Sequence, residues 1–494
     1  MPLNVRDYGA TGVARPAQTL KLENLRHKWL CYAPSITAII YRLPAEAKHD
    51  SIGIQRAIDT AHQAGGGTVI VPAGDYLIAP IELRSRVRLH LEPGATLWGS
   101  PELADYQRPG EPSRPAVWQP SHDGLMPTSS LPTRKLLVSA VEAEDVAITG
   151  FGRIDAQSPN WVIPWMNARP ASWDITRPGF TVFFDRCQRV RVEGIQIHNT
   201  PSWTLVFSAC DDVQVRGVQI RSFDVINSDG IDLVNTSNAR ISDCNIWTTD
   251  DAICLKNMLP DQTMGNVTVT NCVIRTLCNG LKIGTESVGN FQDITFDNIV
   301  IANPDDDAKM AEGGINLCAM DGGFVRNVNI SNVVTRNVDC PFYLMGGLRT
   351  GRQKAVRTPR PGLMERISIS NVQSDGVRYT SWVVGQPAQP IRDVRLANID
   401  VRKTRDFYDR APSGPVPELP EQYPNPFVFG QHQGRDEVPA FGLYLRHVQN
   451  LTASDFRVAC THRDAREFIT QEDCENVSLR ETHFYEGGGG ERNG

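Results

Sequence analysis

The sequence has no strong excess of charge of either sign. Its 494 residues include 50 Lys and Arg against 56 Asp and Glu, a formal net charge of −6. A chain that binds nucleic acid usually carries a clustered basic surface, and this balance offers no basic stripe. We therefore expect no nucleic-acid partner.

A long apolar run and a secretory leader are also missing. The apolar stretch Trp29–Leu43 is too short to span a membrane, and it contains Pro34 and Arg42. The chain opens Met-Pro-Leu-Asn-Val-Arg, without the charged-then-apolar pattern of a signal peptide. We expect no membrane partner and a cytoplasmic protein, unless a leader has been removed.

The chain lacks both a disulfide framework and a metal-ligand pattern. Its 11 cysteines are an odd number, and several lie within or just after alternating apolar segments, where a thiol is more often a small core side chain (Cys210, Cys244, Cys254 and Cys272). The acidic run Asp305–Asp307 is typical of a solvated loop rather than a calcium site. The sequence therefore predicts no cofactor and no metal.

What the chain does have is one long repeat. Its unit is apolar-x-apolar, two residues, then apolar-x-apolar, as in Val190–Val192 followed by Ile195–Ile197. Successive copies start 23 to 28 residues apart, at Val190, Val213, Ala239, Val267 and Ile294, and later copies start at Val328, Ile367, Val394, Leu451 and Val477. Alternation with period two predicts half-buried strands, and a repeat of this length predicts a solenoid.

The repeat predicts an all-β fold, a single-stranded right-handed parallel β-helix. Helical solenoid repeats are usually longer and lack this alternation, and leucine-rich repeats need regularly placed Leu, which this chain lacks. Residues 50–64 have helical spacing instead, with Asp50 or Ser51 as the N-cap and Gly65–Gly67 as the stop. We expect this helix to cap the N-terminal end of the coil stack.

We expect residues 1–486 to form one β-helix domain. Within it, 13–46 is an atypical insertion, and 101–135, 160–178 and 407–439 are long irregular loops. Long excursions from a solenoid tend to gather on its binding face. The Gly-rich residues 487–494 are expected to form a flexible tail.

Two acidic motifs occupy equivalent positions of the repeat. Asn227-Ser-Asp229-Gly-Ile-Asp232-Leu233 precedes Thr249-Asp250-Asp251-Ala-Ile-Cys-Leu255, and aligning their apolar pairs gives an offset of 22 residues, the distance from Asp229 to Asp251. If one repeat is one coil, three carboxylates converge on one small patch. Clustered carboxylates repel one another, so the pattern indicates chemistry rather than architecture.

These motifs, together with Gly280-Leu-Lys282-Ile-Gly-Thr-Glu-Ser287, resemble the family 28 glycoside hydrolases. That family contains polygalacturonases and rhamnogalacturonan hydrolases and belongs to the pectin-lyase-like superfamily of right-handed parallel β-helices. The segments Asn4–Ala10 and Ala440–His447 are similar to the same superfamily, so the resemblance covers nearly the whole chain. It implies an inverting glycosidase that needs no cofactor and acts on a pectin-like oligosaccharide or polysaccharide.

The resemblance also implies roles for the three aspartates. Asp250 would be the general acid, and Asp229 and Asp251 would hold and deprotonate the attacking water. The grouping makes chemical sense, because an inverting pair needs room for a water between carboxyl groups about 6.5–9.5 Å apart. Mutual repulsion among the carboxylates should raise the pKa of one of them and keep an acid protonated.

The chain departs from the polygalacturonase pattern in two places. Those enzymes carry Gly-His-Gly one coil after the aspartate pair, where this chain has Cys278-Asn279-Gly280. They also carry Arg-Ile-Lys to hold the substrate carboxylate, where this chain has Gly314–Cys318 without a cation. Both changes argue against ordinary polygalacturonan binding.

Six residues are candidates for contacting substrate. Asn279 falls in register with Asp251, and Lys282 beside it offers a cation in place of the missing ones. Lys256 and Arg349 are weaker candidates for an anionic sugar, Asp232 continues the outward alternation of its strand, and Asn227 is placed to hold Asp229. The variants Thr285–Ser287 and Asp321–Gly323 resemble the exo-acting and rhamnogalacturonan-type branches of the family, which favours chain-end cleavage.

Two other functions remain open from the sequence alone. One is a calcium-dependent polysaccharide lyase, which shares the fold and breaks the chain by elimination. The other is a β-helix that binds carbohydrate without cleaving it, since the family His and Arg-Ile-Lys are both missing.

Overall fold

The structure is a computed structural model of the chain. It describes residues 2–14, 49–106, 136–161, 177–222, 225, 227–303, 310–353, 358–412, 415–421, 438–486 and 490–493. The insertion 13–46 from residue 15 onward, Asp305–Asp307 and most of the loops 101–135, 160–178 and 407–439 lie outside these residues.

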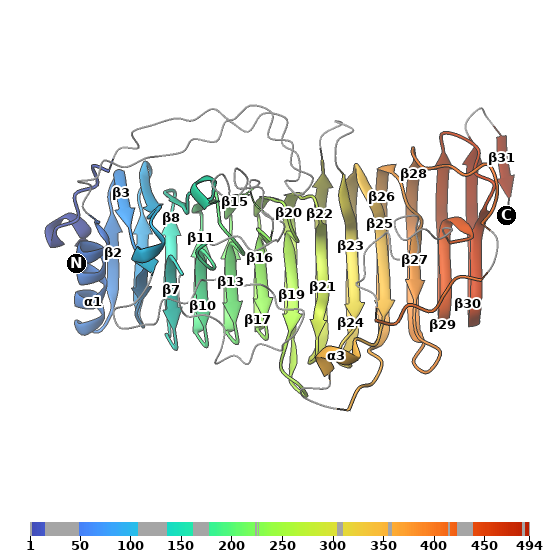
Figure 1. Cartoon of the computed structure of the whole chain (residues 1–494), viewed down its shortest axis with the longest axis horizontal. Helices are drawn as coiled ribbons and strands as arrows, with labels where there is room; N and C mark the ends of the chain where they lie inside the picture. Colours follow the sequence, from blue (N-terminus) through green and yellow to red (C-terminus); the bar gives the residue numbers. More distant parts are fainter. Residues whose placement is uncertain are drawn as a thin grey trace. The chain divides into compact units, whose positions relative to one another are not determined.

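Almost every described strand pairs in parallel with the strand one repeat later, and the fold is a right-handed parallel β-helix, as the sequence predicts. The chain divides into two compact units, the first comprising residues 1–122 and 126–251 and the second 123–125 and 252–494. Figure 1 colours the strands of the first unit blue to green and those of the second yellow-green to red. The single domain over residues 1–486 stays a prediction, and each unit is described by itself.

The first unit stacks short strands in three parallel rows. Row A contains β4 (Ile81–Leu83), β7 (Val138–Val141), β10 (Val182–Asp185), β13 (Leu205–Ser208) and β16 (Ile231–Val234). Row B contains β1 (Leu3–Asn4), β2 (Gly67–Val71), β5 (Val87–Leu91), β8 (Ala147–Gly150), β11 (Gln188–Glu193), β14 (Asp211–Arg216) and β17 (Ser237–Ser242). Row C contains β3 (Gly74–Ile78), β6 (Ala95–Gly99), β9 (Arg153–Asp155), β12 (Gln196–His198), β15 (Gln219–Ser222) and β18 (Asn245–Thr248).

The predicted alternation of apolar residues explains these rows. Val190 lies directly opposite Val213 and Val192 opposite Val215, and all four side chains are fully buried. Each such side chain contributes about 1.5–3 kcal/mol of burial free energy. Aromatic residues stack in the same way, with the Phe184 and Phe207 rings 5.2 Å apart in the same register. Residues of like character one coil apart therefore build the core of the unit.

The expected N-terminal helix is α1 (Ser51–Gln63), which lies beside β2 at the end of the first unit (Figure 1). It buries Ile54, Ala57 and Ile58. Asp50 stands at the N-cap position, but its side chain makes no capping bond to the helix. Its carboxylate instead accepts hydrogen bonds from the backbone and hydroxyl of Thr11, at 2.5 and 3.0 Å, so it ties the N-terminal turn to the helix.

Two short 3-10 helices also belong to the first unit, η1 (Val5–Tyr8) and η2 (Leu103–Tyr106). Trp161, from the loop expected at 160–178, is buried and packs edge-on against Tyr106, with ring centroids 6.1 Å apart. This tryptophan therefore packs onto the protein.

The second unit uses two rows with longer strands. Row D contains β19 (Ile253–Asn257), β21 (Asn279–Ser287), β23 (Ala311–Ala319), β25 (Val338–Gly346), β27 (Ser381–Val384) and the first part of β29 (Ala440–Cys460). Row E contains β20 (Thr263–Arg275), β22 (Asn290–Ala302), β24 (Phe324–Arg336), β26 (Leu363–Val377), β28 (Ile391–Lys403), the remainder of β29, and β30 (Glu467–Glu486). A short helix, α3 (Thr350–Gln353), follows β25.

The C-terminal residues differ from the flexible tail we expected. Residues 490–493 form β31 (Gly490–Asn493), which pairs antiparallel with the end of β30. The last coil offers an unpaired strand edge, and a returning segment can satisfy its backbone groups.

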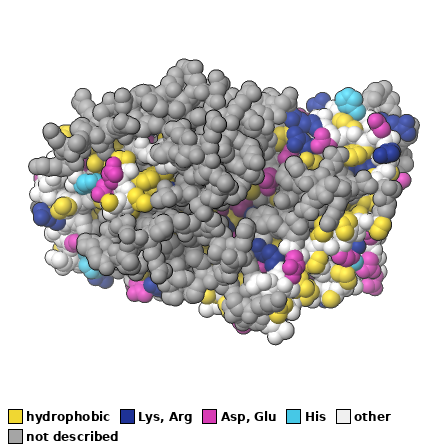
Figure 2. All heavy atoms as spheres, in the orientation of Figure 1, with side chains coloured by type: hydrophobic (Ala, Val, Ile, Leu, Met, Phe, Trp, Pro, Cys, Tyr) yellow, Lys and Arg dark blue, Asp and Glu magenta, His cyan; other side chains and the backbone are white. Residues whose placement is uncertain are grey.

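The described cysteines carry thiols rather than disulfides. Cys210, Cys244, Cys254 and Cys272 are all buried, as expected for small core side chains. No described helix is long and apolar enough to cross a membrane. On the face drawn in Figure 2, the described Lys and Arg side chains are interspersed with Asp and Glu.

Candidate active site

Both acidic motifs lie where the chain leaves row C. Asp229 lies in the connection from β15 to β16, and Asp250 and Asp251 directly follow β18. A main-chain hydrogen bond of 2.9 Å from Gly230 N to Asp251 O joins the two connections. The structure therefore places Asp229 and Asp251 one coil apart, as the offset of the motifs implies.

The three aspartates differ in exposure. Asp229 and Asp251 are each only 3% exposed, whereas Asp250 is half-buried. Thr204 N donates to Asp229 O at 2.9 Å and so fixes the backbone of Asp229 against the preceding coil. Two nearly buried carboxylates and one more accessible carboxylate therefore belong to one corner of the first unit.

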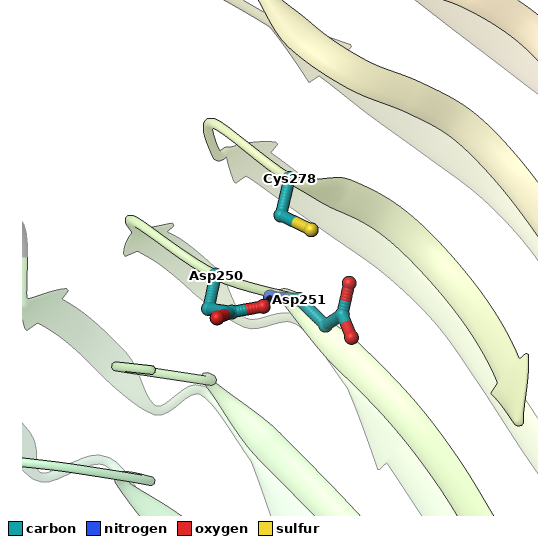
Figure 3. A group of neighbouring side chains, drawn as sticks. All are labelled: Asp250, Asp251 and Cys278. Atoms are coloured by element: carbon teal, nitrogen blue, oxygen red, sulfur yellow. Dashed lines mark hydrogen bonds between the residues drawn. The ribbon is translucent and has the colours of Figure 1, made fainter. Parts of the chain in front are cut away.

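Asp250 is held by its own turn. Its Oδ1 accepts a hydrogen bond from Asp251 N at 2.9 Å, and Thr248 Oγ1 donates to its backbone carbonyl at 2.8 Å. Figure 3 shows the two aspartate side chains at consecutive positions of this turn, and a carboxylate oxygen of each lies within 4.8 Å of one of the other. Cys278, also labelled there, belongs to the second unit.

Asn227 contacts Asp250. Its Nδ2 donates to Asp250 Oδ2 at 3.4 Å, so each oxygen of that carboxylate has an N–H donor. We expected Asn227 to hold Asp229, and the hydrogen bond shown by its side chain goes instead to Asp250, one coil later. Asn227 lies in the connection between β15 and β16 and adopts a left-handed φ of 58°.

Arg177 is a site residue that sequence reasoning missed. It lies just before β10 and is 6% exposed, and its Nη2 donates to Asn227 Oδ1 at 3.2 Å. Burial lowers the pKa of Arg177 to about 10, while the negative charges of Asp250 and Asp229 act in the opposite direction. Arg177 is therefore a buried cation at neutral pH, beside the acidic motifs.

Asp232 occupies the middle of β16, opposite Val206 of β13, and is fully buried. Its neighbours Ile231 and Leu233 are core residues, so Asp232 has the opposite orientation, as its place in the alternation predicts. Whether it contacts substrate stays a prediction.

Asn279, predicted to contact substrate, belongs to a hydrogen-bonded chain of the second unit. Tyr343 donates its hydroxyl proton to Asn279 Oδ1 at 2.5 Å and accepts from Asn316 Nδ2 at 2.9 Å. Asn279 also lies next to the start of β19, because its carbonyl accepts from Ala252 N at 2.8 Å. Tyr343 is a second residue that sequence reasoning missed.

The environment of Tyr343 keeps its hydroxyl protonated. Burial raises the pKa of Tyr343 well above its ordinary value, and the negative charge of Glu312 raises it further, whereas Lys282 lowers it. A protonated hydroxyl is a donor, so the Oδ1 of Asn279 is the acceptor and its Nδ2 is directed elsewhere, with Cys278 Sγ at 3.2 Å.

The three candidate cations of the second unit are not on the open surface. Lys256 and Lys282 are 3% and 2% exposed, and Lys282 lies opposite Asn316 in row D. Arg349 forms a salt bridge with the fully buried Asp321, and its Nη2 donates to Thr285 O at 2.8 Å. Arg349 thus joins the two segments, Thr285–Ser287 and Asp321–Gly323, that resemble the exo-acting branches.

Comparison with known proteins decides the family. The model of the glycosyl hydrolases family 28 matches residues 68–401, which is more than half of the chain. The chain belongs to this family.

Relatives of this family 28 glycosidase agree with that assignment. It is similar to a probable polygalacturonase of Vitis vinifera, with 22% identity over 346 residues covering 68% of this chain and 67% of the relative. Among solved structures, it resembles the hyperthermoactive exopolygalacturonase of Thermotoga maritima, with 22% identity, a TM-score of 0.60 and coverage of 82% of this chain and 87% of the other. It also resembles the family 28 exopolygalacturonase of Yersinia enterocolitica, with 16% identity, a TM-score of 0.63 and coverage of 98% and 78%.

The chain is therefore a glycosidase with a polygalacturonase-like β-helix. A glycosidase that inverts needs one carboxyl group to protonate the leaving oxygen and another to activate water. The corner with Asp229, Asp250 and Asp251 contains three carboxyl groups on two successive coils.

Proposed function

We propose that this glycosidase hydrolyses pectin-like oligosaccharides or polysaccharides of the galacturonan or rhamnogalacturonan type with inversion of the anomeric centre. The observation that carries the proposal is the Gly230 N to Asp251 O bond, which holds two acidic motifs of one repeat in adjacent coils. Structural reasons alone would not gather three carboxylates at one corner, because like charges at such a site destabilise the fold.

In this proposal, Asp250 is the general acid that protonates the leaving oxygen. It is the most exposed of the three aspartates, which suits a group that must reach the glycosidic oxygen. Asp229 and Asp251 hold the attacking water and remove its proton. Their small exposure suits carboxylates that hold one ordered water rather than bulk solvent.

The substrate is anionic or partly so, as in other pectin-degrading enzymes. The Vitis vinifera relative is named a polygalacturonase, yet this chain lacks the Arg-Ile-Lys of that group. Lys282, Lys256 and Asn279 are the second-unit residues we propose for substrate contact. We further propose chain-end cleavage, from the likeness of Thr285–Ser287 and Asp321–Gly323 to exo-acting branches.

A product assay tests the reaction type. The full chain is incubated with oligogalacturonides, rhamnogalacturonan oligosaccharides and rhamnosides, and the anomer of the first product is read by NMR. We expect an inverted reducing end, released one unit at a time. An unsaturated product that absorbs in the near ultraviolet, and that disappears when calcium is chelated, would show a lyase instead.

Substitution of the proposed acid tests the site. Asp250→Asn should lower kcat by about 10²–10⁴-fold, because the amide cannot donate the catalytic proton. The fold should persist, since Asn preserves the shape and the hydrogen bond from Asp251 N. The matched control is Asp243→Asn, which neutralises an exposed carboxylate paired with Arg216 in the same unit and should leave kcat unchanged. Near-normal turnover by Asp250→Asn would refute the assignment.

A further inference from the structure

The first unit contains a buried cation connected to the proposed acid through one amide. Arg177 Nη2 donates to Asn227 Oδ1 at 3.2 Å, and Asn227 Nδ2 donates to Asp250 Oδ2 at 3.4 Å. The three residues come from three separate segments, because the first two are 50 positions apart in the sequence and the last two are 23 positions apart. We call them the Arg177–Asn227–Asp250 chain.

The order of donors in this chain is fixed by chemistry. A guanidinium has only donors, so the Asn227 atom that faces it must be the carbonyl oxygen. The other end of the amide, Nδ2, is then directed to Asp250. Without Arg177, the amide could turn over and present its oxygen to the carboxylate, which would repel it. Arg177 therefore decides which face of Asn227 meets Asp250.

The burial of Arg177 indicates that the arrangement is selected for more than packing. A guanidinium that is 6% exposed loses most of its hydration, which costs several kcal/mol unless anions and acceptors offset the loss. The charges that act on Arg177 in its favour are those of Asp250 and Asp229. A hydrophobic residue would fill the same space at a smaller cost if no function required the charge.

We infer that Arg177 is a positioning residue for catalysis, which orients the carboxyl group of Asp250 through Asn227. The inference rests on the proposed function of Asp250. Arg177 does not touch the reacting atoms in this account. It holds one oxygen of Asp250 at the amide, while Asp251 N holds the other.

This role predicts a separation of kcat from KM. Arg177→Met keeps a long side chain but removes the charge and the donor, and Asn227→Ala removes the relay while leaving Arg177 in place. Each should lower kcat by about 10- to 100-fold with KM changed by less than about threefold. A misplaced acid slows the chemical step, in which the leaving oxygen is protonated, but it does not weaken substrate binding. Arg177→Lys keeps the charge without the planar guanidinium and should recover part of the loss.

A double substitution tests whether the two residues act as one chain. Arg177→Met combined with Asn227→Ala should lower kcat about as much as either change alone, because each already breaks the same connection. Fully additive losses would show two separate effects and overturn the inference. So would a rise in KM with kcat unchanged, which would make Arg177 a substrate-binding residue.

A matched control separates positioning from stability. Arg466, in the second unit, is equally buried and donates to both oxygens of Asp464, at 2.9 and 2.7 Å. Arg466→Met should lower the melting temperature at least as much as Arg177→Met, with kcat unchanged. If both variants lower kcat in proportion to their loss of stability, Arg177 has only a structural role.

A structural measurement keeps the inference independent of substrate. Crystal structures of the full chain with Arg177→Met and with Asn227→Ala should show the Asp250 carboxylate rotated or in two conformers. An unmoved carboxylate in both would overturn the inference even if no substrate were identified. The Asp250→Asn variant distinguishes the two proposals: if it is active, the catalytic assignment fails, whereas an inactive Asp250→Asn beside fully active Arg177 variants removes only the positioning role.

Discussion

Single residues of this glycosidase acquire their properties from the coils above and below them. His198 illustrates this at the end of β12, directly opposite Arg221 of β15. Burial, together with the positive charges of Arg153 and Arg221, lowers the pKa of His198 to about 4. Its neighbours in row C make it a half-buried neutral imidazole.

The stability of the protein should therefore depend on the protonation of His198. Its pKa in the folded chain, about 4, lies below the ordinary value of 6.5, so between these values the unfolded chain binds the proton and the folded chain does not. Folding is thus penalised progressively as the pH falls from about 6.5 toward 4. When the pH is lowered from 7 to 4.5, the melting temperature of the His198→Gln variant should fall by less than that of the parent protein. The exposed His462→Gln is the control, and equal losses in all three proteins would contradict the prediction.

The sequence predicts the acidic residues of the site better than their partners. Asp229, Asp250 and Asp251 can be found because the repeat aligns them, and the alignment carries the spatial information. Arg177 and Tyr343 cannot be found in this way. Each reaches its partner from a distant segment, Arg177 across 50 residues and Tyr343 across 64, and neither belongs to a motif that the repeat duplicates.

Among the secondary-structure elements, the repeat predicts the position of the strands but not their length. The alternating apolar residues predict the rows of strands. Asn residues indicate where the chain bends, because Asn tolerates the left-handed φ found at Asn235, Asn266 and Asn450. Strand length is less predictable. In the second unit the two short strands of each repeat join into one strand of 13 or more residues, as in β20 and β26, although a left-handed Asn lies inside each of these two strands.

The packing of β23 against β25 depends on one glycine. A Cβ at Gly313 would lie 2.5 Å from Tyr343 Cε1 and 2.8 Å from Asn279 Oδ1, both too close. Gly313→Ala should therefore displace the tyrosine ring, break its hydrogen bond to Asn279 and lower the free energy of unfolding by about 1–3 kcal/mol. If Asn279 contacts substrate, KM should rise as well.

A second glycine provides the comparison for this substitution. Gly351 in α3 has open space where a Cβ would be placed, and Gly351→Ala should leave stability and KM nearly unchanged. Chemical denaturation and steady-state kinetics measure both quantities. Equal stability of the two variants would show that β25 can shift to accommodate the methyl group.

On the scale of the whole molecule, each unit is held together by stacked side chains without covalent links among the described cysteines. Eight of the ten described cysteines are buried, and Cys278 and Cys474 are half-buried. Burial raises the pKa of the Cys340 and Cys460 thiols, which makes these sulfurs poor nucleophiles as well as inaccessible.

Thiol labelling should therefore report the folding of both units. In the native protein we expect Cys278 and Cys474 to react first with a maleimide, and the buried thiols to react only when denaturant unfolds the coils around them. Peptide mapping by mass spectrometry assigns each labelled site. Rapid labelling of Cys187 or Cys210 in the native state would contradict the packing of the first unit, and a disulfide between any described pair would contradict their free state.

The main-chain bond between Gly230 and Asp251 has a further consequence for how such an enzyme can change. Because backbone atoms set the interval between the two acidic motifs, substitutions in the surrounding loops leave that interval intact. Gain or loss of a single residue between β16 and β18 would shift it. New sugar preferences can accordingly arise by exchanging side chains and loops, while the length of this one coil stays constant.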